Sequence, residues 1–230
     1  MGDFSIYQFL NWLFSPFYTQ GEYPMIFTEY PFWIFFLLVL FGYGFVYKRL
    51  RLRSVFLFLV SIYFYYKTSG FFFAILLFST VSDFLIGQRI YQNLDHLKAK
   101  LWLAVSVSLN LIVLIYFKYA YFFADSFNAI LGSSWHPINH FALATNSLTG
   151  SSFRVDQILL PIGISFYTFQ TMSYAIDIYR KKLKPVSHII DFGFYVSFFP
   201  QLVAGPIVRA SEFIPQIYKP YELTKKEFGT

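Results

Sequence analysis

Apolar residues follow one another in long stretches that short basic or polar connections separate. The first stretch, Pro31–Tyr47, is about 25 Å long as a helix, which is a minimal membrane span. Leu101–Phe123 is the cleanest spanning candidate, because it is long enough to cross with some tilt. The pattern predicts an all-α, polytopic membrane protein with about six hydrophobic helices. The other stretches are Ser54–Tyr66, which is short for a span, Phe71–Gly87, Gln157–Tyr179 and Ile189–Val208.

Basic residues concentrate in three connections between these stretches. Short connections rich in Lys and Arg stay in the cytoplasm, so these three are predicted to be cytoplasmic and the N-terminus to be outside. Between the first two of them, Lys67–Gly70 is expected to form a small polar turn. The connections contain Lys48–Arg53, then Arg89 with Lys98 and Lys100, and finally Arg180–Lys184.

The chain is predicted to form a single transmembrane domain over residues 1–230, in the inner membrane of a bacterium. Residues 1–30 lack the basic region and cleavage site of a signal peptide and are interpreted as an interfacial or re-entrant segment. Residues 124–156 are polar and contain one basic residue, so we expect an external loop that carries a short surface helix. Lys118 is interpreted as an interfacial anchor rather than a buried functional cation.

Proline and glycine interrupt the last two apolar stretches at positions where a continuous helix is impossible. Pro200 and Pro206 each delete a backbone hydrogen bond, and Gly205 relaxes the chain between them. Pro161 and Gly163 lie in similarly apolar surroundings. Broken backbone at membrane depth persists only where protein or a water-filled cavity covers it. The pattern therefore predicts kinked or re-entrant segments that shape a cavity, while the charges after residue 209 assign the tail to neither side.

Composition supports this class. Hydrophobic residues make up 57% of the 230 residues and charged residues only 13%, which is too few to cover the surface of a soluble globular protein. The net charge of +6 resides in the connections, so we expect no nucleic-acid partner. The absence of Cys excludes disulfides, thiolate metal sites and a Cys nucleophile.

The four histidines all lie outside the apolar stretches, where neither lipid nor packing would tune them as bases. His136 and His140 are four apart, as in some metal sites, but no Cys or carboxylate pattern completes a site. We interpret them as part of a solvated loop and expect no metal. His96 and His188 lie in or beside the basic connections.

Three carboxylates lie near apolar stretches, and ionisable residues at membrane depth are candidates for function. For Asp83 and Asp191 we favour helix capping or headgroup contact. Asp177 could equally pair with Arg180 on one helix and hold a loop at the mouth of a cavity. The chain contains no nucleophile elbow, phosphate-binding glycine loop or dinucleotide fingerprint.

The runs LLPIGISFYTFQTMSYAIDIYR (Leu159–Arg180) and FFPQLVAGPIVR (Phe198–Arg209), with the trailing Ile214–Gln216, resemble the signature of the membrane-bound O-acyltransferase family. Gln201–Pro206 is more similar to the alginate O-acetyltransferase branch than to the D-alanine-transferring branch. The resemblance implies an acyl donor such as acetyl-CoA or another thioester on the cytoplasmic side and a polysaccharide acceptor outside. A funnel through the helices would connect the two.

The family's catalytic His lies downstream of the GPIVR motif, so the chain resembles only the N-terminal half and we carry over no catalytic residue. We expect the isolated chain to be inactive. For the glycines and prolines a purely conformational role stays open, and Arg209 is either an interfacial anchor or a contact to an anionic donor or lipid. The candidate funnel residues are Gln170, Tyr174, Asp177, Pro200, Gln201, Gly205, Pro206 and Arg209.

The partners implied are membrane lipid, the polysaccharide or a periplasmic acetylation partner, and an acyl-donor protein. Two other functions remain open. A non-catalytic membrane scaffold or subunit is favoured by the absence of the catalytic His. A small transporter is favoured by the broken helices but weakened by the lack of internal repeats.

Overall fold

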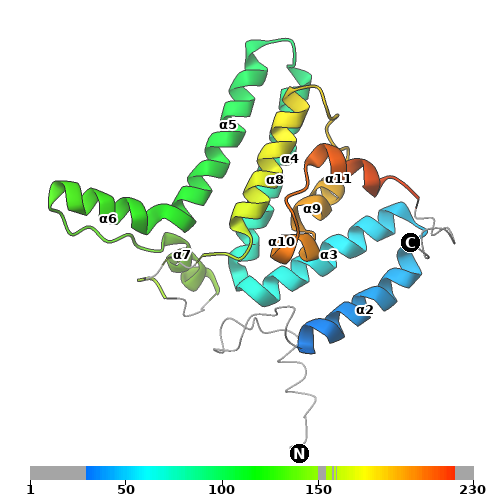
Figure 1. The fold of residues 1–230 in the computed structure, drawn as a ribbon, viewed down its shortest axis with the longest axis horizontal. Coiled ribbons are helices and arrows are strands. Elements are labelled where there is room, and N and C mark those ends of the chain that lie inside the picture. Colours follow the sequence, from blue (N-terminus) through cyan, green and yellow to red (C-terminus); the bar gives the residue numbers. More distant parts are fainter. Residues whose placement is uncertain (1–29, 150–153, 157, 159, 221–230) are drawn as a thin grey trace, which may run out of the picture.

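The computed structural model describes residues 30–149, 154–156, 158 and 160–220, which form helices and no strand (Figure 1). Two helical runs, Leu50–Gln92 and Leu97–Leu131, are long and apolar enough to cross a membrane, and Phe32–Val46 and Ile189–Leu202 are shorter apolar helices. The all-α membrane class is therefore confirmed, while the number of six spans stays a prediction. The predictions for residues 1–29 and 221–230 lie outside the described residues.

The first two helices form a hairpin, and a buried turn connects the second of them to the next helix. Helix α2 (Tyr30–Val46) packs on α3 (Leu50–Ser69), and a 3-10 turn, Gly70–Phe72, leads into α4 (Phe73–Gln92). The sequence predicted a small polar turn at Lys67–Gly70, and this was wrong, because α3 continues to Ser69. Lys67 is fully buried within α3, and Oγ1 of Thr68 donates to the carbonyls of Phe64 and Tyr65. The helix thus satisfies these polar groups locally, and the chain turns only at Gly70.

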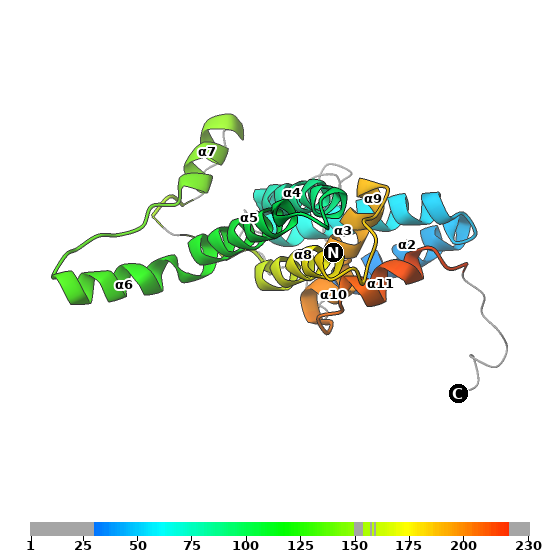
Figure 2. The same ribbon diagram turned by 90° about the horizontal axis from the view of Figure 1, so that it is seen from above.

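Helix α5 (Leu97–Leu114) continues through a π-helical segment, Ile115–Tyr119, into α6 (Ala120–Leu131). Helix α6 extends away from the other long helices in both views (Figures 1 and 2). The predicted external loop therefore begins as a helix, and it also carries α7 (His140–Thr149), which confirms the expected short helix. The side of the membrane on which they lie stays a prediction.

Helix α8 (Ile164–Tyr179) lies between α4 and α5 on one side and α9 (Ile189–Ser197) and α11 (Ala210–Ile217) on the other. A Cβ on Gly87 of α4 would lie 2.6 Å from Cε1 of Tyr174, so only glycine allows α4 and α8 to approach this closely. Short α10 (Phe199–Ala204) follows α9 and contacts α3. This packing encloses the polar residues of α8.

The three basic connections meet at one end of the helices, which we call the basic end. Nζ of Lys181 lies 3.0 Å from Oδ1 of Asp95, joining the α8–α9 and α4–α5 connections. Nε2 of Gln88 donates to the carbonyl of Val186 at 2.8 Å. Where α3 begins, Nη2 of Arg51 lies 3.3 Å from Nε2 of His188, directly before α9. The three basic connections of the sequence thus lie at the same end of the bundle.

Candidate functional site

The two broken segments cover each other. Gly163, directly before α8, has φ +74°, and a Cβ there would lie 2.3 Å from Cδ2 of Leu202 on α10. The hydroxyl of Tyr65 on α3 donates to the carbonyl of Ile162 at 2.6 Å. The interrupted backbone before α8 is therefore hydrogen-bonded to α3 and packed against α10, as broken backbone at membrane depth requires.

The second break separates α9 from α10 at Phe198, whose φ and ψ of −51° and 105° are not helical. Pro200 occupies the first turn of α10, where the absence of its amide hydrogen costs no helical hydrogen bond. At the other end of α10, Gly205 is extended, and a Cβ there would lie 2.6 Å from the Cα of Gln201. Nε2 of Gln201 donates to the carbonyl of Pro206 at 3.1 Å, which fixes this bend. The prediction of a broken rather than continuous helix is confirmed.

Two buried glutamines lie beside these breaks and keep free acceptors. Gln170 on α8 is 2% exposed and Gln201 on α10 is 7% exposed. Oε1 of each accepts no hydrogen bond from the described residues. A buried acceptor without a partner costs about 1–3 kcal/mol, so such atoms call for water or a ligand group as donor. These two oxygens can therefore accept a hydrogen bond from a hydroxyl.

Tyr195 on α9 connects the helices around this region. Its hydroxyl lies 3.2 Å from Oγ of Ser173 on α8 and 3.2 Å from the carbonyl of Val208, in the extended segment before α11. The carbonyl of Gln170 is 3.3 Å from the same hydroxyl. Tyr195 thus joins α8, α9 and the approach to α11 through one oxygen atom.

Helix α11 is held at both ends by other helices. Oγ of Ser173 accepts from the amide of Ala210 at 3.4 Å, and Oδ2 of Asp177 accepts from the amide of Ser211 at 3.3 Å. These are the first two amides of α11, which have no partner within the helix. At the other end, buried Arg53 donates from Nη2 to the carbonyl of Ile217 at 2.5 Å. Helix α11 therefore bridges α8 and the start of α3 at the basic end (Figure 1).

Deeper in the bundle, a buried polar network joins α4, α5 and α8. Oγ of Ser106 donates to Oδ1 of Asp83 at 2.5 Å, and Nδ2 of Asn110 donates to Oδ2 at 2.6 Å. Oγ1 of Thr171 donates in turn to Oδ1 of Asn110 at 2.9 Å. All four side chains are fully buried. The network fixes the rotation of α8 and with it the position of Gln170, the preceding residue.

The chain is similar in sequence to curated proteins that are named as O-acetylases or O-acetyltransferases. The chain is 35% identical over 193 residues to the probable alginate O-acetylase AlgI of Azotobacter vinelandii, and 37% identical to the protein of that name from Pseudomonas aeruginosa. Both matches cover 84% of this chain. It is also 31% identical over 187 residues, 71% of this chain, to the peptidoglycan O-acetyltransferase of Helicobacter pylori.

This chain belongs to the membrane-bound O-acyltransferase family. The matched region amounts to 36%, 34% and 32% of the three relatives, so the chain spans about a third of their length. No family model and no solved structure matches it. The family resemblance is thus confirmed by relatives that match most of the chain.

Within this chain, the structure assembles the candidate funnel residues only in part. Gln170 and Asp177 are buried on α8, and Pro200, Gln201 and Gly205 form the α10 bend. Tyr174 packs its ring 4.2 Å from that of Phe192, and its hydroxyl accepts from the amide of Val186. Pro206 and Arg209 are exposed. The role of these residues in a funnel stays a prediction.

The expectation for Asp83 was wrong, and the structure decides between the alternatives that were open for Asp177. Asp83 neither caps a helix nor contacts headgroups, because it is fully buried in the middle of α4. Asp177 forms no ion pair with Arg180 among the described residues, since its carboxylate turns to α11. Asp191 lies in the first turn of α9, where Oδ2 accepts from the hydroxyl of Tyr218 at 3.1 Å.

Sequence reasoning missed Ser173, Tyr195 and the partners of Asp83. Ser173 had a signal, because it lies three residues after Gln170 and four before Asp177 and therefore shares their helix face. Ser106 and Asn110 are likewise four apart within an apolar stretch. No sequence signal marked Tyr195, because it is one aromatic residue among many.

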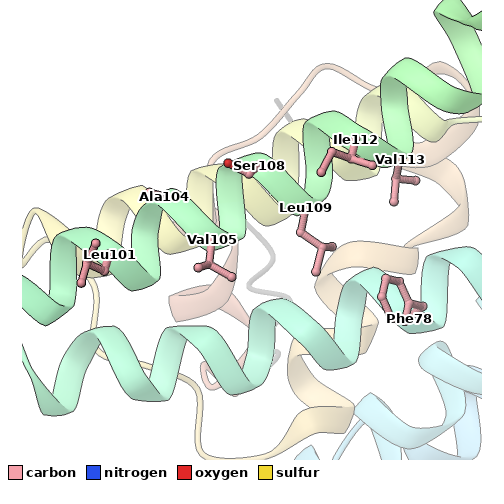
Figure 3. Close-up of a pocket in the computed structure, with 8 residues that line it drawn as sticks. All are labelled: Phe78, Leu101, Ala104, Val105, Ser108, Leu109, Ile112 and Val113. Carbon is pink, nitrogen blue, oxygen red and sulfur yellow. The ribbon is translucent and has the colours of Figure 1, made fainter.

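Other candidate features lie apart from this region. His96, His136, His140 and His188 are all exposed. Lys118 is exposed too, and its Nζ lies 3.4 Å from Oγ of Ser165 and 5.4 Å from the ring centre of Tyr119, in keeping with an anchoring role. A groove between α4 and α5 is lined almost wholly by apolar side chains (Figure 3). Its residues are Phe78, Leu101, Ala104, Val105, Ser108, Leu109, Ile112 and Val113.

Proposed function

We propose that this chain forms part of an O-acetyltransferase that transfers an acetyl group across the bacterial inner membrane to hydroxyls of an extracytoplasmic polysaccharide. The observation that carries the proposal is the identity of 31–37% to proteins named as O-acetylases of alginate and of peptidoglycan. The donor would be acetyl-CoA or another thioester, delivered free or by an acyl-donor protein. The acceptor would be the polysaccharide itself or a periplasmic acetylation partner.

In this proposal the broken segments shape the path between donor and acceptor. The free acceptor oxygens of Gln170 and Gln201 would bind hydroxyl or amide hydrogens of a substrate, and Pro200 and Gly205 would hold Gln201 in place. The general base would come from a residue other than the four exposed histidines, and the isolated chain would transfer no acetyl group.

The experiment that tests the function exchanges the matched region of the Pseudomonas aeruginosa O-acetylase for this chain. The chimera is expressed in cells that lack their own O-acetylase, and acetate released from alginate by mild base is measured. We expect acetylated alginate from the chimera and a loss of at least tenfold from its Gln201→Ala and Gln170→Ala variants. A chimera present in the membrane at normal level but giving no acetate would contradict the proposal.

The same variants separate the enzyme from a scaffold. Variants of an acylation funnel lose acetate transfer while the chimera still co-purifies with its periplasmic partners. A scaffold would lose the partners first. Asn128→Ala in α6 serves as a control, because Asn128 bonds only to the nearby Ser133 and Trp135 among described residues.

We propose that the basic end faces the cytoplasm and that the N-terminus lies outside. The chain contains no Cys, so single cysteines can be introduced without background. Lys182→Cys at the basic end and Ser133→Cys after α6 are both at exposed positions. A membrane-impermeant maleimide should label Ser133→Cys in intact spheroplasts and Lys182→Cys only after lysis. The reverse labelling would refute the orientation.

A further inference from the structure

A groove of about 270 Å³ lies at the basic end, where α3 and α9 begin. Two basic side chains face each other in it, because Nη2 of Arg51 is 3.3 Å from Nε2 of His188. Both side chains are exposed, and neither forms an ion pair with a carboxylate of the described residues. The groove is lined by Arg51, Val55, His188, Ile189, Ile190 and Asp191.

A guanidinium beside an imidazole presents several hydrogen-bond donors to one small space. Arg is suited to phosphate because its planar fork donates two parallel hydrogen bonds to two oxygens. In the contact between them Nε2 of His188 accepts from Arg51, because a guanidinium only donates, so His188 offers the N–H of its other ring nitrogen, Nδ1, to a ligand. The lining residues Ile189 and Ile190 open α9, and the amides of a first helical turn add to the attraction for an anion.

Asp191 also lines the groove, and its charge opposes an anion there. Its Oδ2, however, accepts from the hydroxyl of Tyr218, which directs part of that carboxylate toward the end of α11. The flanking chain favours an anion, since Lys48 and Arg49 precede Arg51 and Lys184 precedes His188. Basic residues next to membrane helices attract anionic groups at the surface.

We propose that this groove binds a phosphate group through Arg51 and His188. Phosphate chemistry has two sources at a membrane surface: the headgroup of an anionic phospholipid, or a soluble organic or inorganic phosphate. The inference is independent of acetyl transfer, and its test measures binding rather than activity.

The test uses the purified chain in a phosphate-free sugar detergent. One arm titrates inorganic pyrophosphate by calorimetry, and the other counts bound phosphatidylglycerol by native mass spectrometry. Binding of pyrophosphate identifies a soluble phosphate as ligand, and binding of phosphatidylglycerol alone identifies a headgroup. In whichever arm binds, we expect Arg51→Gln and His188→Ala to weaken affinity about tenfold or more, because each removes a charged or polar donor.

Two further variants make the result decisive. Lys100→Gln removes an exposed charge at the basic end outside the groove and should leave binding within about twofold, as expected for a screened surface charge. Asp191→Asn should tighten anion binding severalfold while keeping an acceptor for Tyr218. Absence of binding in both arms, equal losses for Lys100→Gln and Arg51→Gln, or weaker binding by Asp191→Asn would each overturn the proposal.

Discussion

Oδ2 of Asp177 on α8 accepts a hydrogen bond of 3.3 Å from the amide of Ser211, the second residue of α11. A side chain of one helix thus does for another helix what an N-cap residue does for its own. Arg209, the residue at the N-cap position, makes no side-chain capping bond. The start of α11 therefore depends on α8.

We expect Asp177→Ala to loosen the start of α11. Loss of a capping acceptor typically costs about 1 kcal/mol, which would raise the opening of this turn roughly fivefold. Hydrogen exchange of a peptide containing Ser211 measures the effect, and Asp177→Asn, which keeps an oxygen acceptor, should lose less. Asp125→Ala, on exposed α6, serves as the control. Unchanged exchange at Ser211 in Asp177→Ala would show that α11 does not need this contact.

The network around Asp83 should behave as one unit. Asn110→Ala leaves one carboxylate oxygen of Asp83 without its donor, so we expect a loss of about 1–3 kcal/mol in unfolding free energy. Asp83→Ala removes the other half of the contact. The double variant should lose less than the sum of the two single losses, with a coupling of about 0.5–2 kcal/mol. Detergent-induced unfolding provides the measurement, and strict additivity would argue against the network.

Gly163 should tolerate no side chain. Alanine there would occupy a left-handed conformation, at about 1 kcal/mol or more, and would clash with Leu202. We expect Gly163→Ala to lower the melting temperature of the purified chain by several degrees. Adding Leu202→Ala to Gly163→Ala should remove the clash but not the strain of the left-handed backbone. Gly44→Ala is the matched control, because a Cβ at Gly44 meets no atom within 4 Å. Equal melting temperatures for Gly163→Ala and Gly44→Ala would refute this account.

The Asp95–Lys181 contact predicts a titration shift at the basic end. The hydrogen bond and charge of Lys181 hold the pKa of Asp95 below its ordinary value. A carboxyl pKa that is lowered in the folded state stabilises the fold above the ordinary pKa, near 4, and this contribution disappears as pH falls through the lowered value. Lys181→Gln should raise the pKa of Asp95 toward its ordinary range. A carboxyl NMR titration measures it, and an identical pKa in both proteins would mean that the contact does not persist in solution.

The breaks in the last apolar stretches could be predicted because their cause is local. Proline lacks an amide hydrogen wherever it occurs, so the ends of α10 follow from Pro200 and Gly205 themselves. The turn expected at Lys67 failed for the opposite reason. A polar residue in an apolar stretch marks an exposed turn only if no neighbouring element covers it, and Lys67 is fully buried.

The sequence by itself determined the membrane class, the family, the broken segments and the connections that share one end, because hydropathy, charge and missing backbone donors act along the chain. The tertiary structure alone decided the partners of the buried polar groups. Ser106 is 23 residues from Asp83, and Ser211 is 34 residues from Asp177. Helix packing, which sums many contacts across the bundle, brings such distant groups within hydrogen-bond distance. No local pattern specifies which acceptor a buried donor will meet.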